Sequence, residues 1–145
     1  MSSIKLEGLP QLIKAFREFG KKLLNKGLAR MFRAGAKVMQ REIKALMPVG
    51  ETKLLRKALK VRSAKRKKDR VGMTVVHGAA DFQGPTFYGP FLNWGTKNKD
   101  GETKIKARNY VDIGFKNGKE SASRAMLETL KVEFDKAAAE ARKAA

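Results

Sequence analysis

The sequence predicts an α+β fold with long N-terminal amphipathic helices, a small antiparallel sheet with a basic hairpin, and a long C-terminal helix packed on the sheet. Three observations support this prediction. Apolar residues recur at helical spacing near both ends of the chain, two strand-like runs lie between them, and a basic block separates these two runs. A length of 145 residues suits one hydrophobic core, so we expect residues 1–145 to form a single domain.

The N-terminal segment predicts a short strand followed by a helix. Residues 3–7 alternate apolar and polar side chains, which is typical of an edge strand. A helix is expected over residues 10–19, because apolar residues in and beside this range fall on one face, and Gly20 ends it. These residues are Leu9, Leu12, Ile13, Phe16 and Phe19.

A longer helix is predicted over residues 22–47, and Pro48 ends it. Its apolar residues step by three and four, so one face is expected to be buried. They are Leu24, Leu28, Met31, Phe32, Gly35, Val38, Met39, Ile43 and Leu46. Gly35 should permit a close crossing by another helix. Basic residues largely off this stripe form an outer face: Lys22, Lys26, Arg30, Arg33, Lys37, Arg41 and Lys44.

A hairpin is predicted in the middle of the chain. Residues 53–57 indicate one helical turn with Leu54 and Leu55 inward. Strands are expected over residues 59–63 and 71–77, where β-branched residues are common. The connection between them carries Lys65, Arg66, Lys67, Lys68 and Arg70. Such a basic block is typical of a solvated hairpin loop, and the alternative is a patch that binds a polyanion.

Residues 86–96 hold the single Trp, one of the two Tyr and two of the eight Phe. Gly89-Pro90 predicts the start of a short helix, and Gly95 predicts its end. The side chains expected to point inward are those of Phe91, Leu92 and Trp94. Aromatic residues anchor both cores and interfaces, so the stretch is either a turn of the core or a contact between subunits. In the first case, Trp94→Ala should cost roughly 3–5 kcal/mol.

Residues 97–104 are polar and include a glycine, so we expect a mobile loop there. Order is expected to resume over residues 105–111. The inward candidates near that point are Tyr110, Val111 and Ile113.

The C-terminal region predicts one more helix. Asn117-Gly118 is typical of a turn, and the helix is expected from about Lys119 onward. Its apolar stripe consists of Ala122, Met126, Leu130, Phe134, Ala137, Ala138 and Ala141. Residues 139–145 are rich in Ala and Lys and are expected to fray.

Net charge is the strongest compositional signal. Lys and Arg number 33 against 14 Asp and Glu, which gives a charge of +19 at pH 7 and a pI near 10.4. Such a field attracts nucleic acid, acidic membranes or acidic proteins. The chain has no apolar run of the about 20 residues that cross a bilayer and no N-terminal signal pattern. It also has no cysteine, which fits a reducing compartment.

Residues that carry catalysis or bind metals are scarce. His77 is the only histidine, and it lies in a predicted strand without a recognisable partner for general-base work. There is no cysteine nucleophile, no phosphate-cradling glycine loop and no His-rich metal spacing. We therefore expect no enzyme, no metal and no cofactor. Nucleic-acid binding is better supported by the charge, although no zinc-finger, ribonucleoprotein or helix-turn-helix pattern is visible.

Three short motifs follow one another along the chain. They are Gly50-Glu51-Thr52-Lys53-Leu54-Leu55-Arg56 after the long helix, Tyr88-Gly89-Pro90-Phe91-Leu92-Asn93-Trp94-Gly95-Thr96 in the aromatic stretch, and Ala107-Arg108-Asn109-Tyr110-Val111 before the last helix. This order resembles that of the tail-completion or head–tail joining proteins of long-tailed phages. It is similar to the HK-ninety-seven gene-product-ten group and to the lambda minor tail protein Z. Asn93 stands where that family usually has Glu, Gly89 and Pro90 replace a small residue and its neighbour, and Asn109 replaces a Pro.

The resemblance implies a non-enzymatic virion protein that forms a ring at the neck through head-to-tail contacts between identical subunits. It implies connector or head-closure proteins, tail-terminator or tail-tube proteins and other copies of the chain as partners, with DNA in the channel as a further contact. The protein would be made in the host cytoplasm and located in the virion. No membrane partner is expected.

The residues that the motifs single out as interface or core positions are Phe87, Tyr88, Phe91, Trp94, Gly95, Thr96, Arg108 and Tyr110. The alternative interpretation is a small basic nucleic-acid-binding protein, in which Lys65, Arg66, Lys67, Lys68 and Arg70 form the polyanion patch. The two interpretations differ in charge geometry. A nucleic-acid module gathers Lys and Arg on one continuous face, whereas an assembly subunit spreads them around an apolar contact patch.

Overall fold

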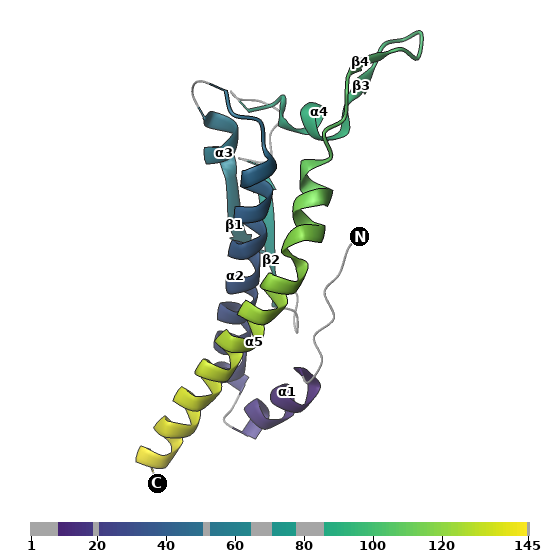
Figure 1. The fold of residues 1–145 in the computed structure, drawn as a ribbon. Coiled ribbons are helices and arrows are strands. Elements are labelled where there is room, and N and C mark those ends of the chain that lie inside the picture. The colour runs from purple at the N-terminus through teal and green to yellow at the C-terminus, as the bar shows by residue number, and fades with distance from the viewer. Residues whose placement is uncertain (1–8, 19–20, 51–52, 65–70, 78–85, 145) are drawn as a thin grey trace.

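Figure 1 shows the computed structural model, which describes residues 9–18, 21–50, 53–64, 71–77 and 86–144. The elements are α1 (Leu9–Glu18), α2 (Lys21–Leu46), α3 (Leu54–Ala58), β1 (Leu59–Ser63), β2 (Met73–His77), α4 (Gly89–Trp94), β3 (Thr96–Lys97), β4 (Thr103–Ile105) and α5 (Tyr110–Ala144). The α+β class is confirmed, because two small antiparallel sheets, each of two strands, accompany the helices in these ranges. The strand expected over residues 3–7 and the stop at Gly20 lie outside them.

Two long helices, α2 and α5, run antiparallel and pack against each other along most of their length (Figure 1). They approach closely because glycines face the partner helix. A Cβ added to Gly114 would lie 2.8 Å from the Cα of Ile43, and one added to Gly35 would lie 2.6 Å from the Sδ of Met126. The close crossing expected at Gly35 is therefore confirmed, and α5 is the helix that makes it.

Two buried clusters hold the helix pair. The first joins α1, α2 and α5, and consists of Met31, Met126, Leu130 and Ala137, with Ile13, Leu28, Phe32 and Phe134 packed against it. The second joins α2, α3, β1 and the start of α5, and consists of Ile43, Met47, Leu55, Leu59 and Tyr110, with Val75, Tyr88, Leu92 and Val111 packed against it. The start of α5 therefore meets the β1–β2 sheet in the second cluster.

The predicted hairpin is present, since β1 and β2 pair antiparallel with Leu59 opposite His77. Leu59 is buried, and its carbonyl accepts a hydrogen bond of 2.6 Å from the Nε2 of Gln40 on α2. The second strand begins at Met73, two residues later than predicted. The basic block of residues 65–70 lies outside the described residues.

The predicted turn at Asn117-Gly118 is wrong, because α5 already begins at Tyr110 and continues through it. Gly118 faces α2, where an added Cβ would come within 3.0 Å of the Sδ of Met39. A glycine costs a helix about 1 kcal/mol relative to alanine, and the close helix contact that Gly118 permits offsets this cost. Residues 139–144, which were expected to fray, continue the helix.

Inward packing is confirmed at Leu55 and Tyr110 and wrong at Leu54 and Ile113, which are exposed. In the short α3, Leu55 takes the inward position and Leu54 does not. Tyr110 and the glycines that follow it at four-residue steps define the face of α5 that meets α2, and Ile113 lies off that line.

Residues 97–104 are more regular than predicted. β3 and β4 pair antiparallel, with an irregularity at Thr96 and Lys97, and form an arm that projects from the body of the molecule (Figure 1). Hydrogen bonds from the amide of Asn98 to the carbonyl of Glu102 (2.8 Å) and from the amide of Gly101 to the carbonyl of Asn98 (3.0 Å) close its turn. The mobility of this arm remains a prediction.

Candidate assembly interface

Exposed apolar side chains gather at one end of the helix pair. In the described ranges, the large hydrophobic residues that are exposed are Leu46, Val49, Leu54, Phe87, Phe91, Trp94, Ile113 and Val132. All except Val132 lie in α3, α4, the segments beside them or the ends of α2 and α5 that meet there (Figure 1). Exposed apolar groups that cluster in this way mark interaction sites more often than scattered ones do.

The short helix α4 forms the centre of this end. Pro90 lies in its first turn, and the amide of Gly95 donates a hydrogen bond of 2.8 Å to the carbonyl of Phe91 at its end. Gly95 has a φ of 74°, and a Cβ added there would lie 2.6 Å from the carbonyl oxygen of Ile105. Only glycine fits this position, so the Gly of the Trp-Gly-Thr motif has a structural explanation.

Three aromatic side chains cover the outer side of α4 and form what we call the aromatic face: Phe87, Phe91 and Trp94. They are 50%, 38% and 67% exposed, respectively. Phe87 and Phe91 meet edge to face with ring centroids 6.4 Å apart. The expectation that Phe91 and Trp94 pack inward is therefore wrong, and so is the interpretation of Trp94 as core.

The inner side of α4 explains this orientation. Its buried residues are Gly89 and Asn93, spaced four apart, and the partly buried Leu92 packs on the second cluster. Because one face of a six-residue helix is already committed to these three residues, Phe91 and Trp94 fall on the opposite face.

Asn93 and Tyr110 attach α4 to the first turn of α5. Asn93 is only 1% exposed, and its Oδ1 accepts a hydrogen bond of 3.0 Å from the amide of Val111. The amides in the first turn of a helix have no acceptor within the helix, and Asn93 supplies one for Val111. The hydroxyl of Tyr110 donates a hydrogen bond of 2.9 Å to the carbonyl of Gly89, and burial raises the pKa of this tyrosine.

Backbone hydrogen bonds strengthen the same attachment. The amide of Arg108 donates to the carbonyl of Leu92 (3.1 Å), and the amide of Asn109 donates to the carbonyl of Asn93 (2.9 Å). Asn109 has a φ of 48°, a left-handed conformation that Asn tolerates better than most residues. A Pro could not donate this bond or adopt this φ, so the replacement of the usual Pro by Asn109 fits this geometry.

The residues predicted from the motifs thus divide into two groups. Phe87, Phe91, Trp94 and Arg108 are exposed, whereas Tyr88, Gly95, Thr96 and Tyr110 are partly or fully buried supports. Asn93 was noted in the sequence only as a departure from the usual Glu, and its role as a cap was missed. The sequence feature that could have indicated this role is the position of Asn93, a polar residue four positions after Gly89 within an aromatic stretch.

Arg56 is a second missed residue. Its Nη2 donates hydrogen bonds to the carbonyls of Met47 (3.0 Å) and Ala45 (3.4 Å), and its Nε donates to Met47 (3.3 Å). It therefore caps the C-terminal end of α2, where carbonyls lack helical partners and positive charge is favoured. Both long helices are capped at this end by side chains from neighbouring short helices.

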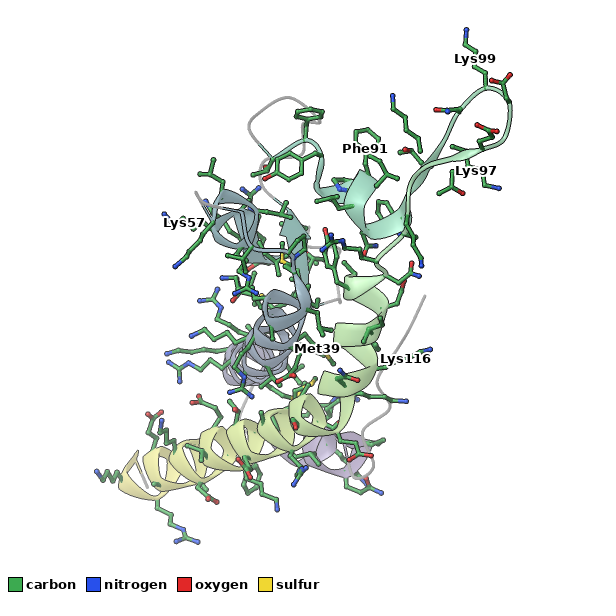
Figure 2. The ribbon with its side chains drawn as sticks, turned by 45° about the horizontal axis from the view of Figure 1, so that its top comes forward. Met39, Lys57, Phe91, Lys97, Lys99 and Lys116 are labelled. Carbon is green, nitrogen blue, oxygen red and sulfur yellow. The ribbon has the colours of Figure 1, made fainter. Side chains whose placement is uncertain are left out.

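The arm places basic residues beside the aromatic face. Lys97, Lys99 and Lys104 are exposed on it. Figure 2 shows Lys99 near the tip of the arm and Lys97 along it, with Phe91 on α4 near the base of the arm. A partner that covers the aromatic face and extends along the arm would also meet these positive charges.

The part of the chain that the structure describes was compared with the requirements of a metal site and of a membrane-spanning helix. It contains no group of three or more His, Cys, Asp or Glu residues that could hold a metal ion. None of its helices is long and apolar enough to cross a membrane. His77 lies in β2, but its side chain is outside the described part.

A comparison with protein-family models gives a match over residues 10–95, more than half of the chain, to HK97-gp10_like, described as "Bacteriophage HK97-gp10, putative tail-component". The chain belongs to this family of phage tail components. No curated protein and no solved structure matches it. The match runs from α1 to the end of α4 and includes the aromatic face, Asn93 and Arg56. The arm and α5 of this tail component lie beyond it.

Proposed function

We propose that this phage tail component completes the tail or joins it to the head by assembling into a ring at the neck of the virion, without catalysing a reaction. The aromatic face, with the arm beside it, is the contact between subunits or with a neighbouring neck protein. The partners are other copies of the chain, connector or head-closure proteins, and tail-terminator or tail-tube proteins. Head-to-tail contacts between identical subunits close into rings.

The observation that carries this proposal is the rigid display of exposed aromatic side chains. Trp94 is the most exposed of the large hydrophobic residues in the described ranges, yet it lies on a helix that buried hydrogen bonds attach to α5. Tryptophan and other aromatic residues dominate the energetics of interfaces. A contact residue on a fixed support also loses little conformational freedom on binding.

Nucleic-acid binding alone explains the charge but leaves the aromatic face without a role. The aromatic face consists of apolar side chains, and seven of the eight exposed large hydrophobic residues of the described chain share its end of the molecule. An apolar centre with a charged rim is the usual anatomy of a protein interface. We therefore favour assembly as the primary function.

Complementation tests the proposal directly. Phage that lacks this gene is supplied with wild-type chain, with Trp94→Ala, or with Val132→Ala as the matched control. Val132 is also exposed, at 50%, but lies on α5 away from the aromatic face. We expect wild type and Val132→Ala to restore infectious particles, and Trp94→Ala to leave unjoined heads and tails in electron micrographs.

The fold of each variant is checked by circular dichroism and urea unfolding. Surface substitutions usually change stability by less than about 0.5 kcal/mol, so both variants should fold. A folded Trp94→Ala chain that restores joined particles would remove the aromatic face from the proposal. Joined, infectious particles in the absence of the chain would overturn the proposed function itself.

A further inference from the structure

The outer face of α2 carries a continuous row of positive charge. Six residues form this row, which we call the basic strip: Lys26, Arg30, Arg33, Lys37, Arg41 and Lys44. They follow one another at steps of three and four, so at about 100° per residue they fall within an arc of about 80° on the helix. The strip lies opposite the side of α2 that Met31, Gly35 and Met39 bury. At 1.5 Å per residue its length is about 27 Å.

Few of these charges are neutralised within the fold. Arg30 pairs with Glu133 of α5, and Arg41 lies 3.5 Å from Glu42. The other four have no ion pair among the described residues, and five of the six residues of the strip are exposed. Figure 2 shows nitrogen-tipped side chains projecting to the left from α2, with Lys57 of α3 on the same side. The strip is therefore available to a ligand.

The composition of the strip favours nucleic acid over an acidic protein. Protein interfaces are built around apolar or aromatic centres and are depleted of lysine, whereas every exposed residue of α2 from Lys26 to Arg41 is basic. A phosphate backbone needs only a row of cations, because every phosphate carries the same charge. At 3.4 Å per base-pair step, the strip spans about eight base pairs of duplex.

We propose that the basic strip binds the phosphate backbone of duplex DNA without sequence preference. This surface is separate from the aromatic face, and the proposal does not depend on ring assembly. Arginine and lysine along the helix contact the phosphates that face it, and binding releases the counterions that the duplex had condensed. Contacts to phosphates carry no sequence information directly, so binding through the strip should not depend on base sequence.

The test compares two triple variants of the full chain that remove the same charge from different helices. The strip variant is Lys26→Gln, Arg33→Gln and Lys37→Gln; the control is Lys116→Gln, Arg124→Gln and Lys131→Gln on α5. All six residues are exposed and have no ion pair in the described part of the chain. Fluorescence anisotropy with a labelled duplex of about 16 base pairs, twice the length of the strip, measures the affinity across a salt series.

Each lost phosphate contact lowers the slope of log affinity against log salt by about 0.9, so the strip variant should lose about 3 units of slope. The control should stay within about 1 unit of wild type. Equal losses in both variants would show that net charge alone is responsible and would overturn the proposal, as would failure of the wild-type chain to bind at low salt. Displacement of the duplex by poly-glutamate at equal charge concentration would instead favour an acidic protein and would also overturn it.

Discussion

The two long helices resemble each other on their inner faces and differ on their outer faces. Where they meet, both use small residues, with Gly35 in α2 and Gly114 and Gly118 in α5. In amino-acid composition, α2 has eight basic residues and one acidic residue, whereas α5 has seven basic and six acidic residues. The residues of the inner faces are therefore determined by the packing of the two helices against each other. The residues of the outer faces are determined by the surroundings of each helix. The difference shows that, of the two long helices, α2 carries most of the net positive charge.

The largest effect is expected from a substitution where the inner faces of α2 and α5 pack against each other. Gly114→Ala places a Cβ 2.8 Å from the backbone of Ile43, which cannot move without shifting α2, so we expect a loss of about 3 kcal/mol in unfolding free energy. Urea unfolding measures it. Gly35→Ala is the matched control, because the atoms it meets belong to the flexible side chain of Met126, and we expect it to cost less than about 1 kcal/mol. Equal costs would contradict this account of the contact.

The next prediction concerns the cap on α5. Asn93→Ala removes the acceptor for the amide of Val111, and the loss of such a cap costs about 1–2 kcal/mol. Asn117→Ala, at an exposed position within α5, serves as the control and should be neutral or slightly stabilising, since Ala favours helix. Thermal unfolding compares the two variants. An Asn93→Ala chain as stable as wild type would mean that the hydrogen bond from Asn93 to the amide of Val111 contributes nothing to stability.

A smaller effect is expected from the buried tyrosine. Tyr110→Phe removes the hydroxyl that donates a hydrogen bond to the carbonyl of Gly89, which costs about 1 kcal/mol at neutral pH. Burial raises the pKa of Tyr110 above its ordinary value of 10.0. Below that value the phenol is neutral in both folded and unfolded states, so it adds no pH dependence. As the pH rises from there through the folded pKa, the unfolded chain releases its proton first and the folded state loses stability.

The stability difference between wild type and Tyr110→Phe should therefore narrow above about pH 10 and stay constant below it. Urea unfolding of both chains at matched pH values measures this difference, and the many lysines titrate equally in the two. A difference that stays constant through the alkaline range would show that the phenol ionises as readily in the folded state as in the unfolded chain.

The smallest change in stability is expected from substitutions on the outer faces of α2 and α5. Lys37 has like charges four residues away on both sides, Arg33 and Arg41, whereas Lys131 has Glu128 and Asp135 at helical neighbour positions. Lys37→Gln should therefore stabilise, and Lys131→Gln destabilise, each by about 0.2–0.5 kcal/mol at low ionic strength. Both effects should fade at about 1 M salt, where screening is strong. Shifts of the same sign would contradict the contrast between the two outer faces.

The sequence predicted the elements that are marked by the spacing of apolar residues, by runs of β-branched residues and by residues that end helices. Apolar spacing located α2, the stop at Pro48 agreed with its end, and β-branched runs located the hairpin. The start of α5 was missed because Asn117-Gly118 has the composition of a turn, whereas in the fold Gly118 lies within a helix and packs closely against Met39 and Glu42 of α2. Local composition cannot report a contact made by residues far away in the chain.

At the candidate site, too, contacts between residues far apart in the chain could not be predicted from local composition. The motif located the aromatic stretch, and the short helix within it was predicted correctly. The inward direction was correct for Leu92 and wrong for Phe91 and Trp94, because Gly89 and Asn93 take the inner face, where Tyr110 and Val111 of α5 are their hydrogen-bond partners. The basic outer face of α2 was predicted from spacing alone, since exposed charge opposite an apolar stripe needs no distant partner.

The attachment of α4 to α5 has a consequence for recombination between related phages. The family match ends at residue 95, between the two halves of this attachment. A crossover there would join α4 of one parent to α5 of another and separate Asn93 from Val111, and Gly89 from Tyr110. A crossover before residue 86 keeps all four on one parental segment. Viable mosaics should therefore inherit residues 86–111 as one block.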